Sequence, residues 1–152
     1  MTLETHAIAM ALLVDDGRVL LAHRYPARRW YPDCWDLVGG HIEPGETPEQ
    51  AVRRECHEEI GVVARALRPM AITLSAPGIE PHAFVITEWD GEPTNAAIEE
   101  HDELAWFTPA QLTALVMAHP SLKPQILRAI HVSPRYPGGP SHGTLLRIWT
   151  RY

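Results

Sequence analysis

The sequence predicts a single α/β domain of the α+β type, in which a β-sheet packs against helices. Three observations predict this class. An apolar run over 6–14, an Asp-Asp-Gly turn and a second apolar run over 18–24 form the pattern of a β-hairpin. A segment over 48–60 carries both start and stop signals of a helix. At 152 residues the chain is long enough for one domain with a real core.

The remaining elements follow from local composition and turn signals. In chain order they are an aromatic, Pro- and Arg-rich loop over 25–34, a short strand over 35–38, an extended segment over 63–74, a strand over 82–89, an acidic loop over 92–103, a strand over 104–107, and helices over 109–118 and 120–130. The tail over 133–152 is expected to be irregular and to end in a short strand over 144–150. We expect one domain over 1–152, with no internal repeat.

The helix over 48–60 is the best-defined element. Thr47 and Gln50 have the spacing of a capping box. Pro48 stands at the first helical position, where its missing N–H costs nothing. Gly61 supplies the stop. An apolar stripe on this helix can face a core, and it consists of Val52, Cys56 and Ile60.

Three glutamates, Glu55, Glu58 and Glu59, crowd one side of this helix near its C-terminus. Like charges three and four residues apart repel each other, and the helix dipole disfavours negative charge at this end. A solvated acidic face is the ordinary explanation of such a helix. A hard cation such as Mg²⁺ or Mn²⁺ would remove both penalties, because it binds carboxylate oxygens. The residues alone leave these two explanations open.

The segment from Gly40 to Val62 resembles the Nudix hydrolase family. The family box reads Gly, five residues, Glu, seven residues, Arg-Glu, an apolar residue, any residue, Glu-Glu, any residue, Gly and an apolar residue. The matching positions are Gly40, Glu46, Arg54, Glu55, Cys56, Glu58, Glu59, Gly61 and Val62. The preceding WDLVGG, over 35–40, is similar to the family's strand that leads into the box.

This resemblance implies a Nudix-like α/β/α sandwich with a mixed β-sheet. It also implies that Mg²⁺, or Mn²⁺, is held by Glu55, Glu58 and Glu59, with help from the backbone carbonyl of Gly39. The supporting catalytic residues that it implies are Glu46 and Arg54. Glu58 lies one turn after Arg54, so that an ion pair can orient its carboxylate.

The general base is not fixed by the box, because some family members use a box glutamate and others use a carboxylate of a distal loop. The acidic loop offers Glu99, Glu100, Asp102 and Glu103. Glu100 and Glu103 are the preferred candidates, and simple solvation of this loop is the alternative.

Two other groups of side chains have both a functional and a structural explanation. The loop over 25–34 and the residue before it supply three arginines, which suit phosphate, and three aromatic rings, which can stack on a base or cover the core edge. They are Arg24, Tyr25, Arg28, Arg29, Trp30 and Tyr31. His41 can touch phosphate or serve as an ordinary loop histidine, and His57 is expected to be exposed.

The resemblance implies Mg-dependent hydrolysis of a nucleoside diphosphate linked to another moiety. A nucleoside triphosphate, oxidised or not, cleaved to nucleoside monophosphate and pyrophosphate is favoured, since the compact chain is similar to MutT-like members. Pro77 stands at a distance from Gly61 that resembles ADP-ribose pyrophosphatases, so ADP-ribose or another nucleotide sugar is the alternative. A non-catalytic nucleotide-sensing module and the isoprenoid isomerase branch are rival classes. The complete box argues against the first, and the surroundings of Cys34 and Cys56 argue against the second.

Composition excludes several other partners. The net charge of −6 argues against binding of a nucleic-acid polymer, which needs a basic surface. No apolar run has the length of a membrane span, and none follows a basic N-terminal region. Two cysteines do not make a disulfide framework or a zinc site, so a reducing cytoplasm is expected. The expected partner is a small-molecule nucleotide or nucleoside diphosphate derivative, and a homodimer is left open.

Overall fold

Strand β1 (His6–Asp15) is the centre of the sheet, because its side chains enter cores on both faces. A computed structural model of the chain describes residues 4–132. Along β1, Ala9, Ala11 and Leu13 enter one core, whereas Met10, Leu12 and Val14 enter the other. This alternation is the two-residue period of a strand that is buried on both faces.

The sheet is mixed, as predicted. The other strands are β2 (Arg18–Arg24), β3 (Trp35–Asp36), β4 (Val38–His41), β5 (Val63–Met70), β6 (Ile79–Asp90) and β7 (His101–Phe107). Their order is β3-β2-β1-β6-β5, with β4 also paired to β1 and β7 to β2. Strand β6 runs parallel to β1, and the other pairs are antiparallel.

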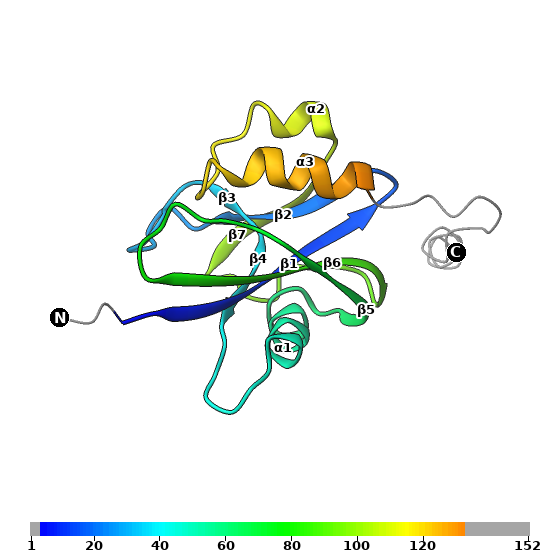
Figure 1. Ribbon diagram of the computed structural model, residues 1–152. Helices are drawn as coiled ribbons and strands as arrows, with labels where there is room; N and C mark the ends of the chain where they lie inside the picture. The colour runs from blue at the N-terminus through cyan, green and yellow to red at the C-terminus, as the bar shows by residue number, and fades with distance from the viewer. Residues whose placement is uncertain (1–3, 133–152) are drawn as a thin grey trace.

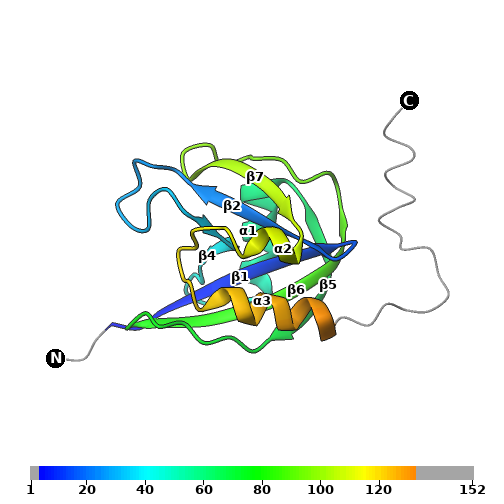
Figure 2. The same ribbon diagram turned by 90° about the horizontal axis from the view of Figure 1, so that it is seen from above.

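Helices cover both faces of this sheet (Figure 1). Helix α1 (Pro48–Ile60) lies on one face, and α2 (Pro109–Leu112) and α3 (Leu122–Val132) lie on the other. Seen from above, α3 lies over β1 and β6 (Figure 2). The chain therefore has the predicted α/β/α sandwich.

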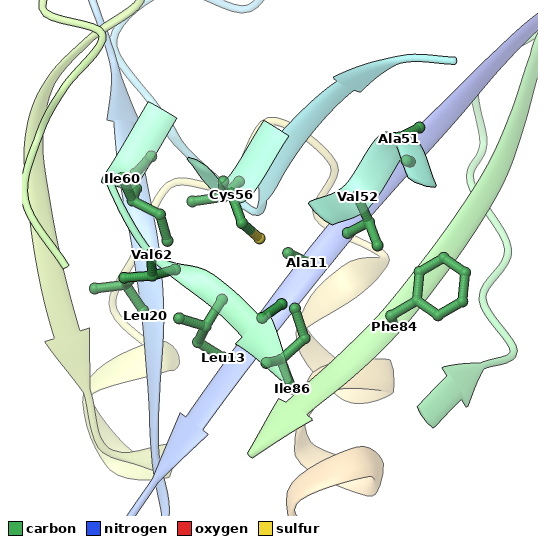
Figure 3. Close-up of a cluster of buried hydrophobic side chains, with 14 residues drawn as sticks. Ala11, Leu13, Leu20, Ala51, Val52, Cys56, Ile60, Val62, Phe84 and Ile86 are labelled. Atoms are coloured by element: carbon green, nitrogen blue, oxygen red, sulfur yellow. The ribbon is translucent and has the colours of Figure 1, made fainter. Parts of the chain in front are cut away.

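The stripe predicted on α1 forms the core on its face of the sheet (Figure 3). Val52, Cys56 and Ile60 are fully buried, and their side chains point toward the strand residues Leu13 and Ile86. This burial fixes how α1 is rotated about its axis, and so fixes which of its glutamates meet the sheet.

The segment over 109–118 does not form the single helix that we expected. Helix α2 ends at Leu112, and the chain then turns away. Trp35 N–H donates to Val116 O at 2.8 Å, and Ala118 N–H donates to Trp35 O at 2.8 Å. Pairing with β3 thus uses the backbone groups that a longer helix would need. Local helix propensity does not predict such a tertiary contact.

The strand expected over 35–38 is two strands, because β3 pairs with β2 whereas β4 pairs with β1. Strand β7 begins at His101, within the expected acidic loop, because it extends the pairing with β2. The strand within the segment expected over 63–74 ends at Met70. Strand β6 is longer than the expected strand over 82–89, and α3 begins two residues after the expected start at 120. The strand expected over 144–150 lies outside the described residues. Within 4–132, no helix is both long and apolar enough to cross a membrane.

Candidate functional site

The ends of α1 are fixed by the signals that the sequence predicted. Thr47 Oγ1 accepts a hydrogen bond from Gln50 N–H, and the Gln50 side chain accepts from Thr47 N–H, which completes the capping box. Pro48 is the first helical residue, and Gly61 ends the helix with a φ of 69°, a left-handed conformation that suits glycine. The glutamates of α1 therefore occupy a rigid helix.

Arg54 is the centre of an ion-pair network at the start of the site. Its Nε and Nη2 donate to the two oxygens of Glu46 at 2.8 and 3.0 Å, a bidentate pair. Its Nη1 donates to Glu55 Oε1 at 2.8 Å and to Glu58 Oε2 at 3.2 Å. Its Nη2 also donates to the carbonyl of His41 at 3.0 Å. One guanidinium thus ties the box loop to two glutamates of α1.

Glu46 is held as a carboxylate by this network. Hydrogen bonds from Arg54 and from Glu43 N–H lower the pKa of Glu46 from 4.5 to about 2. Desolvation would raise the pKa of Glu46, but these hydrogen bonds outweigh it. The pKa of Arg54 is raised because Glu46 and Glu55 stabilise its charge. Glu46 therefore holds Arg54 in place, and Arg54 in turn holds Glu55 and Glu58.

Glu55 is buried against the backbone of Gly40. A β-carbon at position 40 would lie 2.5 Å from Glu55 Oε1, so only glycine leaves room for this carboxylate. Burial raises the pKa of Glu55, and the hydrogen bond from Arg54 opposes that rise. The glycine that opens the box is thus explained by the position of a glutamate on the helix.

Glu59 occupies the most buried position of the three, with its side chain 7% exposed. Its Oε2 accepts a hydrogen bond from Gly39 N–H at 3.1 Å. The carboxyl group of Glu100 hydrogen-bonds to it from the loop before β7. Desolvation, followed by the contact with Glu100 and the charge of Glu55, raises the pKa of Glu59 far above its ordinary value of 4.5. Within residues 4–132, no Arg or Lys contacts Glu59.

The loop before β7 docks onto the end of α1. Thr94 N–H donates to Ile60 O at 3.0 Å, and Ala96 N–H donates to Glu59 O at 2.9 Å. Asn95 Nδ2 donates to the carbonyl of His101 at 2.7 Å. These contacts satisfy carbonyls at the helix C-terminus and bring Glu100 to Glu59. Only the tertiary structure shows this docking.

The structure brings Glu100 into the site, but no described contact joins Glu103 to α1. Glu103 lies on β7 opposite His23 and is exposed. His57 is exposed, as expected. The ring of His41 packs edge-on against His6, with 5.7 Å between ring centroids, and only its carbonyl joins the network.

Sequence reasoning missed His101. Its side chain is 5% exposed, and Nε2 lies 4.0 Å from Glu59 Oε2. Burial lowers its pKa, so the neutral imidazole is favoured. Its place directly after Glu100 was the only sequence signal, and the expected loop did not predict that the side chain would be buried.

The loop over 25–34 has both structural and site-facing residues. Arg24 donates to the carbonyls of Trp30 and Tyr31 at 2.8 Å each, which makes it a support of the loop. Arg28 instead faces the site, because its Nη1 lies 3.9 Å from Glu100 Oε2 and donates to Glu100 O at 3.5 Å.

Beside Arg28 lies an open groove of about 580 Å³, lined by Tyr25, Ala27, Arg28, Ile98 and Glu99. Tyr25 and Ile98 are 43% and 71% exposed. The groove therefore combines apolar surface with the charged side chains of Arg28 and Glu99.

The carboxylates fit a hard divalent cation by charge and chemistry, although they do not form a ready chelate. Within residues 4–132, no three Asp, Glu, His or Cys side chains converge closely enough to hold a metal ion as they stand. The reason is that Arg54 draws Glu58 and one oxygen of Glu55 toward itself. Glu55, Glu59 and Glu100 still concentrate oxygen donors where burial makes their charge costly, and a cation offsets that cost.

Comparisons with known proteins agree with this architecture. The NUDIX domain family matches residues 4–129. A MutT NUDIX hydrolase structure from Burkholderia pseudomallei superimposes with a TM-score of 0.70 and 25% identity, covering 82% of this chain and 97% of that chain. The chain belongs to the Nudix hydrolase family, and its fold is similar to that of MutT.

Curated relatives have several different activities. The NAD-capped RNA hydrolase NudC of Chromobacterium violaceum is 38% identical over 112 residues, 72% of this chain but only 40% of that protein. The CTP pyrophosphohydrolase of Escherichia coli is 32% identical over 107 residues, 68% of this chain and 76% of that protein. The isopentenyl-diphosphate Delta-isomerase of Corynebacterium diphtheriae is 33% identical over 120 residues, 71% of this chain and 64% of that protein.

Proposed function

We propose that the protein is a divalent-metal-dependent pyrophosphohydrolase that cleaves a phosphoanhydride bond of a nucleoside triphosphate, releasing nucleoside monophosphate and pyrophosphate. The observation that carries this proposal is the cluster of Glu55, Glu59 and Glu100, which lies beside Arg28 in a chain with a complete Nudix box. Burial makes the charge of Glu55 and Glu59 costly, and Arg28, which contacts Glu100, also lines the groove.

Glu55, Glu58 and Glu59, with the carbonyl of Gly39, would hold Mg²⁺ or Mn²⁺. When bound, the ion neutralises charge on the phosphoryl oxygens. The protein's own groups prepare these ligands. Arg54 holds Glu55 and Glu58, and Gly39 N–H orients Glu59. Glu46 positions Arg54, so its role is indirect.

Glu100 is the proposed general base that takes a proton from the attacking water. It lies at Glu59, beside the proposed metal ligands, and Arg28 Nη1 lies 3.9 Å from its carboxylate. Glu103 offers the same chemistry without this contact. Glu100→Gln should lower kcat by about 10²–10⁴-fold. The matched Glu103→Gln variant should retain its kcat, and the opposite result would move the base to Glu103.

The groove beside Arg28 is the proposed site for the nucleoside part of the substrate. Its size lies within the usual range of ligand pockets, about 300–1,000 Å³. Tyr25 and Ile98 offer an aromatic face and an apolar side chain to a planar base. Tyr25→Ala should raise KM about tenfold with little change in kcat, the scale of one lost base stack. Val116→Ala, at another exposed apolar residue, is the control.

The choice of a nucleoside triphosphate rests on the MutT-like fold and on the CTP pyrophosphohydrolase relative. ADP-ribose or another nucleotide sugar is the alternative. Its only support is Pro77, which lies in the turn before β6, and no described contact joins that turn to the carboxylates. NAD is also tested, because the NudC relative is an NAD-capped RNA hydrolase.

A substrate panel tests the proposal. The purified protein with Mg²⁺ is incubated with ordinary and oxidised nucleoside triphosphates, ADP-ribose and NAD, and the products are identified. The highest kcat/KM should be with a triphosphate, and ¹⁸O-labelled water should place the label on one phosphate product. Preference for ADP-ribose would replace the substrate. Nucleotide binding without turnover would favour the sensing module, and isomerisation of isopentenyl diphosphate would place the chain in the isomerase branch.

A further inference from the structure

His101 is a buried histidine whose ring has no hydrogen-bond partner within the described residues. It opens β7, its side chain is 5% exposed, and neither Nδ1 nor Nε2 forms a hydrogen bond there. Buried polar groups are nearly always paired, and leaving one unpaired costs about 1–3 kcal/mol. A leucine could fill the same space without that cost, so the imidazole needs a reason.

The ring of His101 faces an oxygen of Glu59. His101 Nε2 lies 4.0 Å from Glu59 Oε2, and that oxygen already accepts a hydrogen bond from Gly39 N–H. A closer approach of about 1 Å would bring Nε2 to hydrogen-bond distance. Two donors on Oε2 would fix the plane of the carboxylate and leave Oε1 facing away from both.

The backbone around His101 is anchored to the same end of α1. Asn95 Nδ2 donates to His101 O at 2.7 Å, and Ala96 N–H donates to Glu59 O at 2.9 Å. The loop therefore holds the imidazole beside Glu59 through contacts that do not involve the ring. Because these anchors survive a change of the side chain, the ring itself can be tested separately.

We propose that His101 is a positioning residue, which donates a hydrogen bond from Nε2 to Glu59 Oε2 and so orients this carboxylate for metal binding. The inference rests on the proposed function, in which Glu59 is a metal ligand. Groups that hydrogen-bond to metal ligands fix the ligand's orientation, and their loss typically weakens metal affinity by about 10–100-fold. A histidine that only filled the core would have no such effect.

Three variants separate the two roles. His101→Leu fills the space without a donor, and His101→Gln keeps an N–H donor that can reach Glu59. His57→Leu is the matched control, because His57 lies on α1 near Glu59 but is exposed. Mn²⁺ is titrated into each substrate-free protein, and the melting temperature Tm is measured without metal.

We expect His101→Leu to bind Mn²⁺ about 10–100-fold more weakly, with an unchanged or higher Tm. His101→Gln should recover most of the affinity, and His57→Leu should match the wild type. Equal Mn²⁺ affinity in His101→Leu and the wild type would overturn the inference. Weaker binding with a lowered Tm that His101→Gln does not restore would also overturn it. If the wild type binds Mn²⁺, the affinity of His101→Leu tests the role of His101 separately from the proposed function. A wild type that binds no Mn²⁺ would overturn both.

Discussion

Two groups of carboxylates lie at the same helix and have opposite environments. Glu46 and Glu58 share the guanidinium of Arg54, and the pKa of Glu46 falls to about 2. Glu59 faces the sheet from α1 and meets Glu100 of the loop before β7, and burial raises the pKa of Glu59. The first group keeps its charge because one guanidinium hydrogen-bonds to it. In the second group burial makes the charge of Glu59 costly, and a bound cation would offset that cost.

This difference follows from how α1 sits on the sheet. Its apolar stripe turns Glu55 and Glu59 toward Gly40 and Gly39, where water is excluded. Glu58 remains 57% exposed, within reach of Arg54. Identical side chains thus acquire different environments: one guanidinium holds some of them, and the sheet buries others. Three measurements test this difference, and a fourth tests the attacking group.

The largest effect is expected when the proposed metal ligands lose their cation or their charge. Excess EDTA should abolish turnover, and Mg²⁺ should restore it. Glu55→Gln, Glu58→Gln and Glu59→Gln should each lower kcat by at least about 10²-fold, the scale of losing one electrostatic stabiliser. Full turnover in EDTA would show that the carboxylates do not act through a metal.

The Arg54 network is tested by removing its arginine. Arg54→Gln leaves the buried Glu55 and the bidentate Glu46 without their guanidinium, so we expect a loss of about 2 kcal/mol of stability in a urea titration. Arg65→Gln is the matched control, because Arg65 pairs with Asp90 at the surface. Its loss should cost clearly less stability than the loss of Arg54, because solvent screens an exposed pair. Equal losses in the two variants would mean that the Arg54 network is no more than a surface ion pair.

A smaller effect, opposite in sign, is expected for Glu59→Gln without metal. The folded protein keeps a proton on Glu59 that the unfolded chain loses, so wild-type stability should fall as the pH rises above 4.5, the ordinary pKa of this group. Glu59→Gln removes that loss. Its Tm should exceed that of the wild type by about 2–4 °C at pH 8, the change that about 1 kcal/mol produces in a domain of this size.

The difference between the two Tm values should shrink at pH 5, where the unfolded chain also begins to hold the proton. A lower Tm for Glu59→Gln at pH 8 would show that the carboxylate is structural. Glu58→Gln is the control, because it removes a neighbouring carboxylate whose side chain is largely exposed.

The smallest effect on catalysis is expected from the cysteines. Cys56 lies in the core, where burial raises its pKa to about 12, and burial also raises the pKa of Cys34. Neither thiol is suited to nucleophilic attack, because the thiolate is the reactive form. A Cys34→Ala, Cys56→Ala double variant that still folds should keep its kcat. Loss of activity, or a trapped covalent intermediate, would contradict direct attack by water.

The sequence predicted α1, its caps and its apolar stripe because these depend on neighbours within one or two turns. It did not predict that the helix expected over 109–118 would end at Leu112, because the pairing of Trp35 with Val116 joins distant segments. Similarly, it offered Glu100 and Glu103 as equal candidates. The docking of the 94–101 loop on α1 decides which of them meets Glu59.

The sequence by itself determined the identity of the box carboxylates, because spacing along a helix fixes which side chains share a side. It also determined the family resemblance, which in turn implied the mixed-sheet sandwich. Only the tertiary structure decided which carboxylates pair with Arg54 and which are buried against the sheet. That outcome depends on the desolvation of Glu59 by the sheet and on the distance from Arg54, and both are set by packing between segments far apart in the chain. The buried His101 has the same origin, since its burial and its place beside Glu59 arise only when β7 and α1 meet.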